Sequence, residues 1–212
     1  MGSLEIISFA IGIIGFLGGL PQIFGYNWKD LWLYYYRGVI SWRKVHQTVL
    51  EVKYKLYEDS YKPDVIIGIG RGGAICAGLL CSELMDEVDG YHPRIEIVNS
   101  KVVFRKRDSR AKVERIELSK QDFSDISVVP SQKVVIIIAQ SFTGHSLQEA
   151  LGKILAKQIP RENIRTVALF WHRNPKLKVK VIHQPDIVGK YLPIGKTTPW
   201  KMHQESPTDR FR

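Results

Sequence analysis

The stretch that most constrains the fold is residues 134–147, where an apolar run leads directly into a turn of small and polar residues. Its first five residues are β-branched without alternation, which is typical of a strand covered on both faces in a parallel sheet. Ser141, Thr143 and Ser146 then offer hydroxyl groups, and Gly144 allows close approach of a ligand. The helix expected next has unpaired N–H groups at a positive dipole end. The pattern predicts a phosphate-binding loop; the competing interpretation is an ordinary helix with Ser146 as its N-cap.

A second stretch of the same design lies at residues 63–85. An apolar strand leads into a Gly-Arg-Gly-Gly turn at positions 70–73, and a helix is predicted from Ala74 to about Met85. Two strand–turn–helix units in one α/β domain place both turns at the carboxyl edge of the sheet, where open α/β folds bind ligands. The guanidinium group of Arg71 is suited to bind a second phosphate there.

On these residues the chain resembles the type I phosphoribosyltransferases, in particular the xanthine-guanine and related purine-like members, over residues 41–203. The resemblance implies an α/β fold, with a parallel sheet flanked by helices and a small C-terminal hood. It also implies that one turn binds pyrophosphate and the other binds the 5′-phosphate of phosphoribosyl pyrophosphate. The implied contacts are Arg71, Gly72, Gly73, Ser141, Thr143, Gly144, His145 and Ser146.

The acidic residues of this family are missing from the corresponding positions. Members carry two adjacent acids where the central strand ends, which hold the ribose hydroxyls, and often a third before the Thr-Gly pair. This chain has Ile138, Ala139 and Phe142 there, and no Asp or Glu lies between Ser131 and Gln148. Losing two such ribose contacts costs roughly 3–6 kcal/mol, or a factor on the order of 10² to 10⁴ in affinity. No catalytic residue and no protein metal ligand is therefore assigned, and Mg²⁺ is expected only if catalysis survives.

The resemblance assigns a base pocket to the later part of the chain. His172 stands where purine-like members have a base-recognising Lys, and residues 184–189 are similar to the hood strand that stacks on the base. This assignment places Ile187 and Val188 in the pocket, with Trp200 at the end of the hood. Packing in the core is the competing interpretation for each of these side chains.

An uncharged segment, residues 6–20, lies near the N-terminus, and its apolar character continues to Phe24. Its length is close to the roughly 20 residues that cross a bilayer. Aromatic residues and cations follow between positions 26 and 44, as at a cytoplasmic membrane flank. Residues 1–40 are predicted to form a single-pass transmembrane helix and its juxtamembrane segment, with the domain at 41–212 facing the cytoplasm. The competing interpretation is an apolar helix docked on the domain or on a partner.

Small residues within this apolar segment predict self-association. Ser8, Gly12, Gly15 and Gly19 follow one another at spacings of four, three and four, which places them on one face of a helix. Such a face allows close helix–helix contact in lipid. A homo-oligomer formed through the N-terminal helix is therefore one expected assembly, although glycine is common in transmembrane helices in general.

Cations are concentrated in residues 101–120, which contain eight Lys or Arg against three acids. In the resembling family, a flexible loop or hairpin in this place closes over the pyrophosphate, and cations would strengthen such a lid. A solvated hairpin is an equal alternative, and contact with anionic lipid or nucleic acid is a third. Nucleic acid is disfavoured because the juxtamembrane cations account for part of the net charge of +10 and no nucleic-acid module is present.

Two cysteines, Cys76 and Cys81, lie five positions apart in the predicted helix, which is neither metal nor disulfide spacing. They are predicted to be buried thiols in a reducing compartment.

The function predicted from these features is binding of a phosphoribosyl compound or nucleotide by a membrane-anchored, catalytically degenerate domain, a sensor or effector. The alternative is an active Mg²⁺-dependent enzyme that transfers phosphoribose from phosphoribosyl pyrophosphate to a purine-like base. A third hypothesis is a membrane scaffold with a vestigial pocket. Arg71 and the hydroxyl groups at 141–146 argue against this scaffold.

Overall fold

The structure is a computed structural model that describes residues 38–85, 90–107, 110–118, 120–172, 181–193 and 198–199. The chain divides into two compact units, Met1–Lys44 with Gly195–Arg212, and Val45–Ile194. The predicted transmembrane segment and Trp200 lie outside the described residues. Within the described ranges, no helix is both long enough and apolar enough to cross a bilayer. The account below concerns the unit Val45–Ile194.

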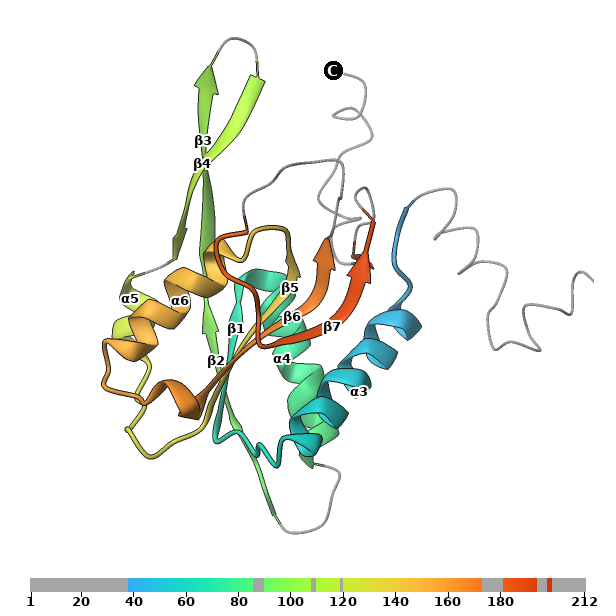
Figure 1. Ribbon diagram of the computed structural model, residues 1–212, viewed down its shortest axis with the longest axis vertical. Helices are drawn as coiled ribbons and strands as arrows, with labels where there is room; N and C mark the ends of the chain where they lie inside the picture. Colours follow the sequence, from blue (N-terminus) through green and yellow to red (C-terminus); the bar gives the residue numbers. More distant parts are fainter. Residues whose placement is uncertain are drawn as a thin grey trace, which may run out of the picture. The chain divides into compact units, whose positions relative to one another are not determined.

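A five-stranded sheet, in which every neighbouring pair is parallel, forms the centre of this unit (Figure 1). All five residues of β1 and most of β5 are buried, as expected for strands covered on both faces. The predicted parallel sheet between helices is therefore confirmed. In spatial order the strands are β2 (Arg94–Val98), β1 (Val65–Ile69), β5 (Val134–Ser141), β6 (Ile164–His172) and β7 (Ile187–Leu192).

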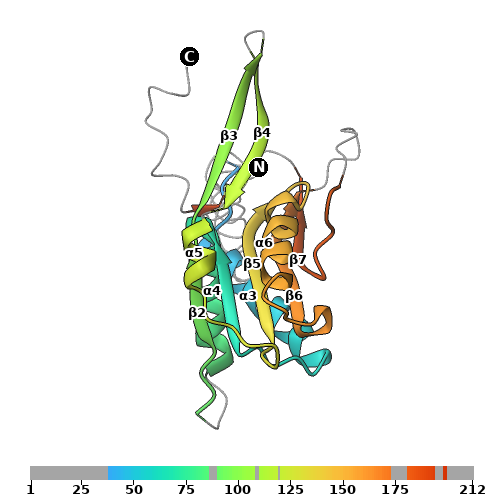
Figure 2. The same cartoon turned by 90° about the vertical axis from the view of Figure 1, so that its left-hand side faces the viewer.

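Helices cover both faces of the sheet (Figures 1 and 2). One face carries α3 (Trp42–Glu58) and α4 (Gly70–Met85), and the other carries α5 (Lys120–Asp125) and α6 (His145–Leu155). A short 3₁₀ helix, η1 (Arg161–Asn163), precedes β6. The apolar positions of α3 that recur at spacings of four, three and four are all buried: Val45, Val49, Val52 and Leu56.

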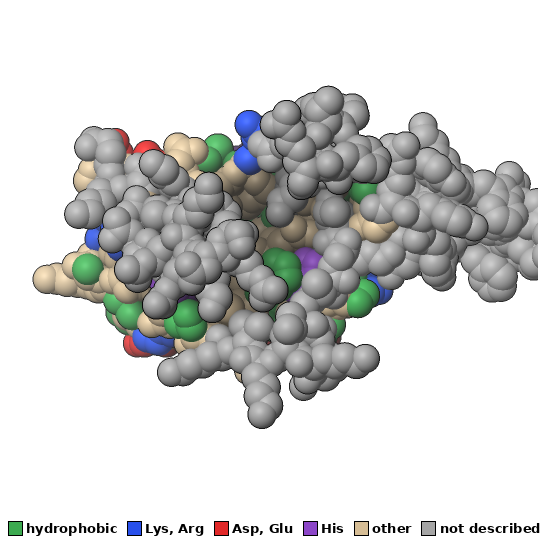
Figure 3. Space-filling model, turned by 90° about the horizontal axis from the view of Figure 1, so that it is seen from above, with side chains coloured by type: hydrophobic (Ala, Val, Ile, Leu, Met, Phe, Trp, Pro, Cys, Tyr) green, Lys and Arg blue, Asp and Glu red, His purple; other side chains and the backbone are tan. Residues whose placement is uncertain are grey.

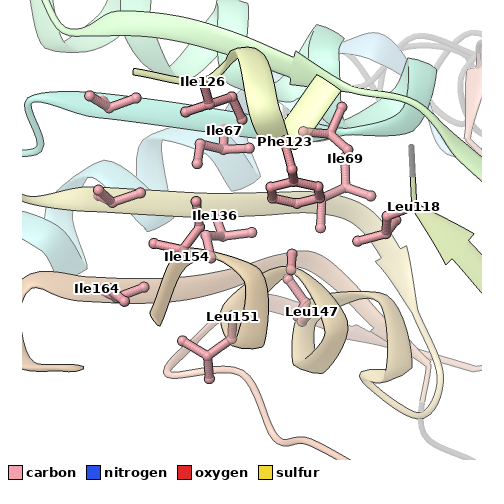
Figure 4. Packing of buried hydrophobic residues seen from close by; sticks show 14 of the residues in the cluster. Ile67, Ile69, Leu118, Phe123, Ile126, Ile136, Leu147, Leu151, Ile154 and Ile164 are labelled. Atoms are coloured by element: carbon pink, nitrogen blue, oxygen red, sulfur yellow. The ribbon is translucent and has the colours of Figure 1, made fainter. Parts of the chain in front are cut away.

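A hydrophobic core fills the space between the sheet and the α5–α6 layer (Figure 4). Alternate strand residues such as Ile67 and Ile136 face it, because successive side chains of a strand point to opposite faces. Leu147, Leu151 and Ile154 from α6 complete it from the helix side. On the opposite face, Cys76 and Cys81 of α4 are buried free thiols. Burial raises the pKa of Cys76 to about 12, so this residue stays protonated at neutral pH.

The cation-rich segment forms an antiparallel hairpin that extends beyond the carboxyl edge of the sheet (Figure 1). Its strands are β3 (Ser100–Arg107) and β4 (Arg110–Leu118), and their register shifts between Val103 and Phe104. The hairpin is a two-stranded sheet of its own, separate from the parallel sheet.

Two sequence-based expectations about element boundaries were wrong. Helix α4 begins at Gly70 instead of Ala74, so Arg71 lies in its first turn. Residues 187–192 form the edge strand β7 of the central sheet instead of a strand in a separate hood. Strand β7 joins the sheet in close contact with α3, because a Cβ on Gly189 would lie 2.5 Å from Cγ2 of Thr48 in α3. Only glycine lets α3 approach β7 this closely.

Candidate functional site

The chain reverses its direction of travel across the sheet between β1 and β5. From β1 it moves outward to β2, and it then returns to add β5 on the other side of β1. Ile69 pairs with Ile138, so both strands end at the same edge. The crevice beyond such a reversal is where ligands of open α/β folds bind. The structure thus brings together the two predicted phosphate turns, one at Arg71 and the other at residues 141–146.

The second of these, the β5–α6 turn (residues 141–146), is held by its own hydroxyl groups. Oγ of Ser141 accepts a hydrogen bond from the N–H of Gly144 at 3.1 Å, and Oγ1 of Thr143 accepts one from the N–H of His145 at 3.4 Å. Each hydroxyl keeps its own proton, which it can donate to an anion. The N-cap of α6 is Gly144, so the competing interpretation of Ser146 as the N-cap is wrong.

Gly144 is required at this turn for two reasons. Its φ of 77° lies in the left-handed region, which favours glycine. In addition, a Cβ at this position would lie 1.8 Å from the backbone oxygen of His183. The carbonyl oxygen of Thr143 accepts hydrogen bonds from the amides of Ile182 at 2.8 Å and His183 at 3.1 Å. Residues 181–183 therefore lie directly against the turn.

The Arg71 turn depends on backbone-to-backbone contact between β1 and α4. A Cβ on Gly68 would lie 2.7 Å from the carbonyl carbon of Gly73, and a Cβ on Gly73 would lie 2.8 Å from the oxygen of Ile137. These glycines let the start of α4 lie on β1 and β5. Arg71 is exposed in the first helical turn, and Gly72 and Gly73 follow it there. The guanidinium group is therefore accessible to an anion at this edge.

Apolar side chains occupy the three positions at which the resemblance predicts acids. Ala139 is buried, and Ile138 is partly buried against the core. Phe142 is 48% exposed, and its ring stacks on His172 with centroids 4.4 Å apart and planes at 10°. This corner of the site consequently presents a flat aromatic surface instead of a carboxylate.

His172 is the last residue of β6, and only 4% of it is exposed. Its Nδ1 lies 3.2 Å from the carbonyl oxygen of Pro193, which favours an N–H at that nitrogen. Through Phe142 it borders the β5–α6 turn. Ile187 and Val188 do not lie beside His172. His172 pairs with Leu192, and Val188 lies four residues earlier in β7, about 13 Å along the strand at 3.3 Å per residue. Val188 instead packs against the core.

Residues 41–195 match the family model of the phosphoribosyl transferase domain. The chain belongs to this family. The match spans the sheet and both turns, and it confirms the resemblance that was inferred from the residues around Arg71 and Gly144.

Solved structures share the fold of this domain. A purine phosphoribosyltransferase from Pyrococcus horikoshii is 25% identical, with a TM-score of 0.50 over 76% of this chain and 91% of that one. A hypothetical protein from Neisseria gonorrhoeae with bound ppGpp has a TM-score of 0.60 at 15% identity, covering 80% and 90%. Xanthine-guanine-hypoxanthine phosphoribosyltransferase from Helicobacter pylori has a TM-score of 0.56 at 13% identity, covering 78% and 94%. The last two show the shared fold. No curated protein sequence matches the chain.

Figure 3 shows the carboxyl edge of this phosphoribosyltransferase domain. From above, a histidine and adjoining hydrophobic side chains are visible near the middle of the face, and acidic atoms are drawn towards its margin (Figure 3). In the parts of the chain that the structure describes, no group of three His, Cys, Asp or Glu side chains is placed to hold a metal ion.

A polar network beside the β5–α6 turn was missed by sequence reasoning. It joins Arg161 of η1, Thr166 of β6, and His183 and Asp186 from the segment before β7. Burial lowers the pKa of His183, although the Asp186 carboxylate opposes this effect. Burial raises the pKa of Asp186, but hydrogen bonds from Thr166 and Arg161 outweigh it and leave this pKa below its ordinary value. Asp186, which follows Pro185, is the residue in the sequence that could have indicated this network, but the resemblance assigned it to the hood strand.

Proposed function

We propose that this phosphoribosyltransferase domain binds a nucleotide or another phosphorylated ribose compound without transferring phosphoribose, as a sensor or effector beside a membrane. The observation that carries the proposal is the contrast at the end of β5. The β5–α6 turn keeps the form of a phosphate loop, while Phe142 stacks on His172 where the family has an acid.

Phosphate binding rests on two features of this edge. The N-terminus of α6 directs its dipole and first amides towards the turn, and the hydroxyl groups of Ser141 and Thr143 can donate their protons. Arg71 adds an exposed cation at the adjacent strand end. Two phosphate subsites are consistent with a ligand that carries phosphates at both ends of a ribose, or with a nucleotide.

A nucleobase is the expected partner of the Phe142 ring. An exposed aromatic ring offers a face on which a base can stack, and such stacking contributes about 1–3 kcal/mol per base. A bare sugar phosphate has no π face and gains nothing from this ring. The proposed preference is therefore for nucleotides over ribose 5-phosphate.

The residues at the end of β5 do not fit Mg²⁺. This ion prefers oxygen ligands in octahedral geometry, and Ile138, Ala139 and Phe142 offer no side-chain oxygen where the family has carboxylates. No step of the proposed function therefore passes through a metal. The alternative function is an active, Mg²⁺-dependent enzyme. Family membership and the 25% identity to the Pyrococcus purine phosphoribosyltransferase support this alternative, and the experiments below distinguish it from the proposal.

The first prediction concerns the ligand. Calorimetry with GMP, ppGpp and phosphoribosyl pyrophosphate should show binding of at least one nucleotide, with little change when Mg²⁺ is removed. Arg71→Ala should weaken it by roughly 1–3 kcal/mol, the range for a charge-assisted hydrogen bond. Arg71→Lys should restore part of the affinity, because it keeps the charge and loses the planar fork. Lys62→Ala removes an exposed cation just before β1, at the opposite edge, and should leave binding unchanged.

The same preparation tests turnover. Pyrophosphate release from phosphoribosyl pyrophosphate should be undetectable with guanine, hypoxanthine or xanthine, with or without Mg²⁺. Robust Mg²⁺-dependent release that Arg71→Ala abolishes would show instead that the domain is an active phosphoribosyltransferase.

The second prediction concerns the membrane, and it rests on the uncharged residues 6–20 and the aromatic and cationic residues that follow. The full chain should sediment with membranes and resist alkaline carbonate extraction. A chain that begins at Asn27 lacks the apolar run and should be recovered in the supernatant. Recovery of the full chain in the soluble fraction without detergent would contradict the anchor.

A further inference from the structure

We infer that residues 181–186 form a strap that holds the β5–α6 turn in its phosphate-binding shape, with His183 as the positioning residue. The inference rests on the proposed function in one respect, namely that the turn is the part of the site that binds phosphate. No residue of the strap needs to touch the ligand for this role, because the strap acts through Thr143 and Gly144.

The strap contacts the turn through its backbone. Both amides at positions 182 and 183 donate to the carbonyl oxygen of Thr143, at 2.8 and 3.1 Å. The carbonyl group of His183 lies against Gly144 so closely that no Cβ fits between them. The hydrogen bonds to Thr143 and the contact with Gly144 lie on either side of the peptide bond that joins these two residues. They therefore restrict the orientation of the Thr143–Gly144 peptide, which contributes the N–H that Ser141 accepts.

Apolar burial is incomplete at the end of the strap that contacts the turn. Val181 and Ile182 are 50% and 49% exposed, so about half of their surface stays in contact with water at this end. A segment with few buried apolar contacts opens locally at low free energy unless polar contacts fix it. Pro185 is buried at the other end of the strap, and the remaining attachment comes from hydrogen bonds.

Those hydrogen bonds converge on Thr166 of β6. Its Oγ1 lies 2.8 Å from Oδ2 of Asp186, 3.1 Å from the amide nitrogen of Asp186 and 3.0 Å from Nε2 of His183. A hydroxyl has one proton and two lone pairs. The proton is best donated to the carboxylate, one lone pair accepts the Asp186 amide, and the other accepts an N–H from Nε2 of His183. All three capacities of the hydroxyl are then used.

The network is in turn fixed to the frame of the domain. The amide of Thr166 donates to Oδ2 of Asp186 at 2.7 Å, and Arg161 of η1 forms an ion pair with Oδ1 at 2.6 Å. Thr166 itself is fully buried in β6. His183 thus joins a rigid strand by its ring and the β5–α6 turn by its backbone. It is the one strap residue among those described that makes both contacts.

The test is amide hydrogen exchange in the ligand-free protein, comparing His183→Ala with the natural sequence. Exchange at Gly144 and His145 should accelerate about tenfold, which corresponds to about 1.4 kcal/mol of local opening free energy. The amide of Ile136, inside β5, should not change, because the opening is local. His183→Gln keeps an N–H donor near the position of Nε2 and should restore most of the protection. Gln184→Ala alters an exposed neighbour in the same strap and is the matched control.

Unchanged exchange at Gly144 and His145 in His183→Ala would overturn the inference, and so would equal acceleration in Gln184→Ala. If His183→Ala does not fold, Asp186→Asn provides the same readout, because it removes the charge that pairs with Arg161 and keeps the side-chain shape. Acceleration at the turn is again the supporting result, and unchanged exchange the opposing one.

Nucleotide affinity, measured on the same variants, separates this inference from the proposed function. Weaker binding in His183→Ala, with recovery in His183→Gln, supports both. If the natural protein binds no phosphorylated probe, the proposed function fails, while hydrogen exchange still decides whether the strap holds the turn. If the probe binds and His183→Ala changes neither exchange nor affinity, the strap inference fails and the proposed function stands.

Discussion

Gly144→Ala is expected to lower the free energy of unfolding by roughly 2–5 kcal/mol and to abolish nucleotide binding. The left-handed backbone at this residue costs an L-amino acid roughly 1–2 kcal/mol. The new Cβ would also lie 1.8 Å from the backbone oxygen of His183 and 2.7 Å from its carbonyl carbon. These are backbone atoms, which cannot rotate away, so the strap or the turn must move, and overpacking of this kind typically costs about 1–3 kcal/mol.

Gly152→Ala is the matched control in the same helix. A Cβ on Gly152 meets no atom within 4 Å, and the residue is exposed in the interior of α6. Alanine is favoured over glycine in a helix by up to about 1 kcal/mol, so this variant should be neutral or slightly more stable. Chemical denaturation of both variants and calorimetry with the same nucleotide measure the two effects. Equal stability and equal affinity of Gly144→Ala and the natural protein would contradict the geometry of the turn.

Gly68→Ala is expected to destabilise the domain by about 3 kcal/mol, at the upper end of the usual range for overpacking. Its Cβ would lie 2.7 Å from the carbonyl carbon and oxygen of Gly73 and 2.8 Å from the amide nitrogen of Ala74. All three atoms belong to the backbone of α4, so the start of this helix must lift away from β1. Arg71 moves with it, and nucleotide affinity should fall even under conditions in which the variant is folded.

Gly78→Ala separates this effect from the general consequence of replacing a glycine near α4. A Cβ at Gly78 meets nothing within 4 Å, and Gly78 lies within the same helix. Its free energy of unfolding should stay the same or rise. A denaturation midpoint for Gly68→Ala that matches the natural protein would show that β1 and α4 do not approach each other as closely as the structure indicates.

Several elements of the domain could be predicted from the sequence, because their patterns are local. The unbroken β-branched run from Val134 to Ile138 requires a strand covered on both faces, and the spacing of Val45, Val49 and Val52 requires a helix with one buried face. Parallel strands place their carboxyl ends at one edge, so the meeting of Arg71 with the 141–146 turn also followed from the sequence. The resemblance to the phosphoribosyltransferase family rested on the residues of these two turns, and the match to the family model over residues 41–195 confirms it.

The surroundings of these turns depend on how the whole domain folds. Ile187 and Val188 suited a hood strand or the core, and the structure places them in the edge strand β7, where Gly189 packs against Thr48 of α3. The stacking of Phe142 on His172 and the strap at His183 join residues that are far apart in the chain. No periodicity or spacing records such contacts, because they depend on which side chains and carbonyl groups the folded backbone brings together. Sequence reasoning could therefore locate the phosphate turn, and the fold supplied the strap that holds it.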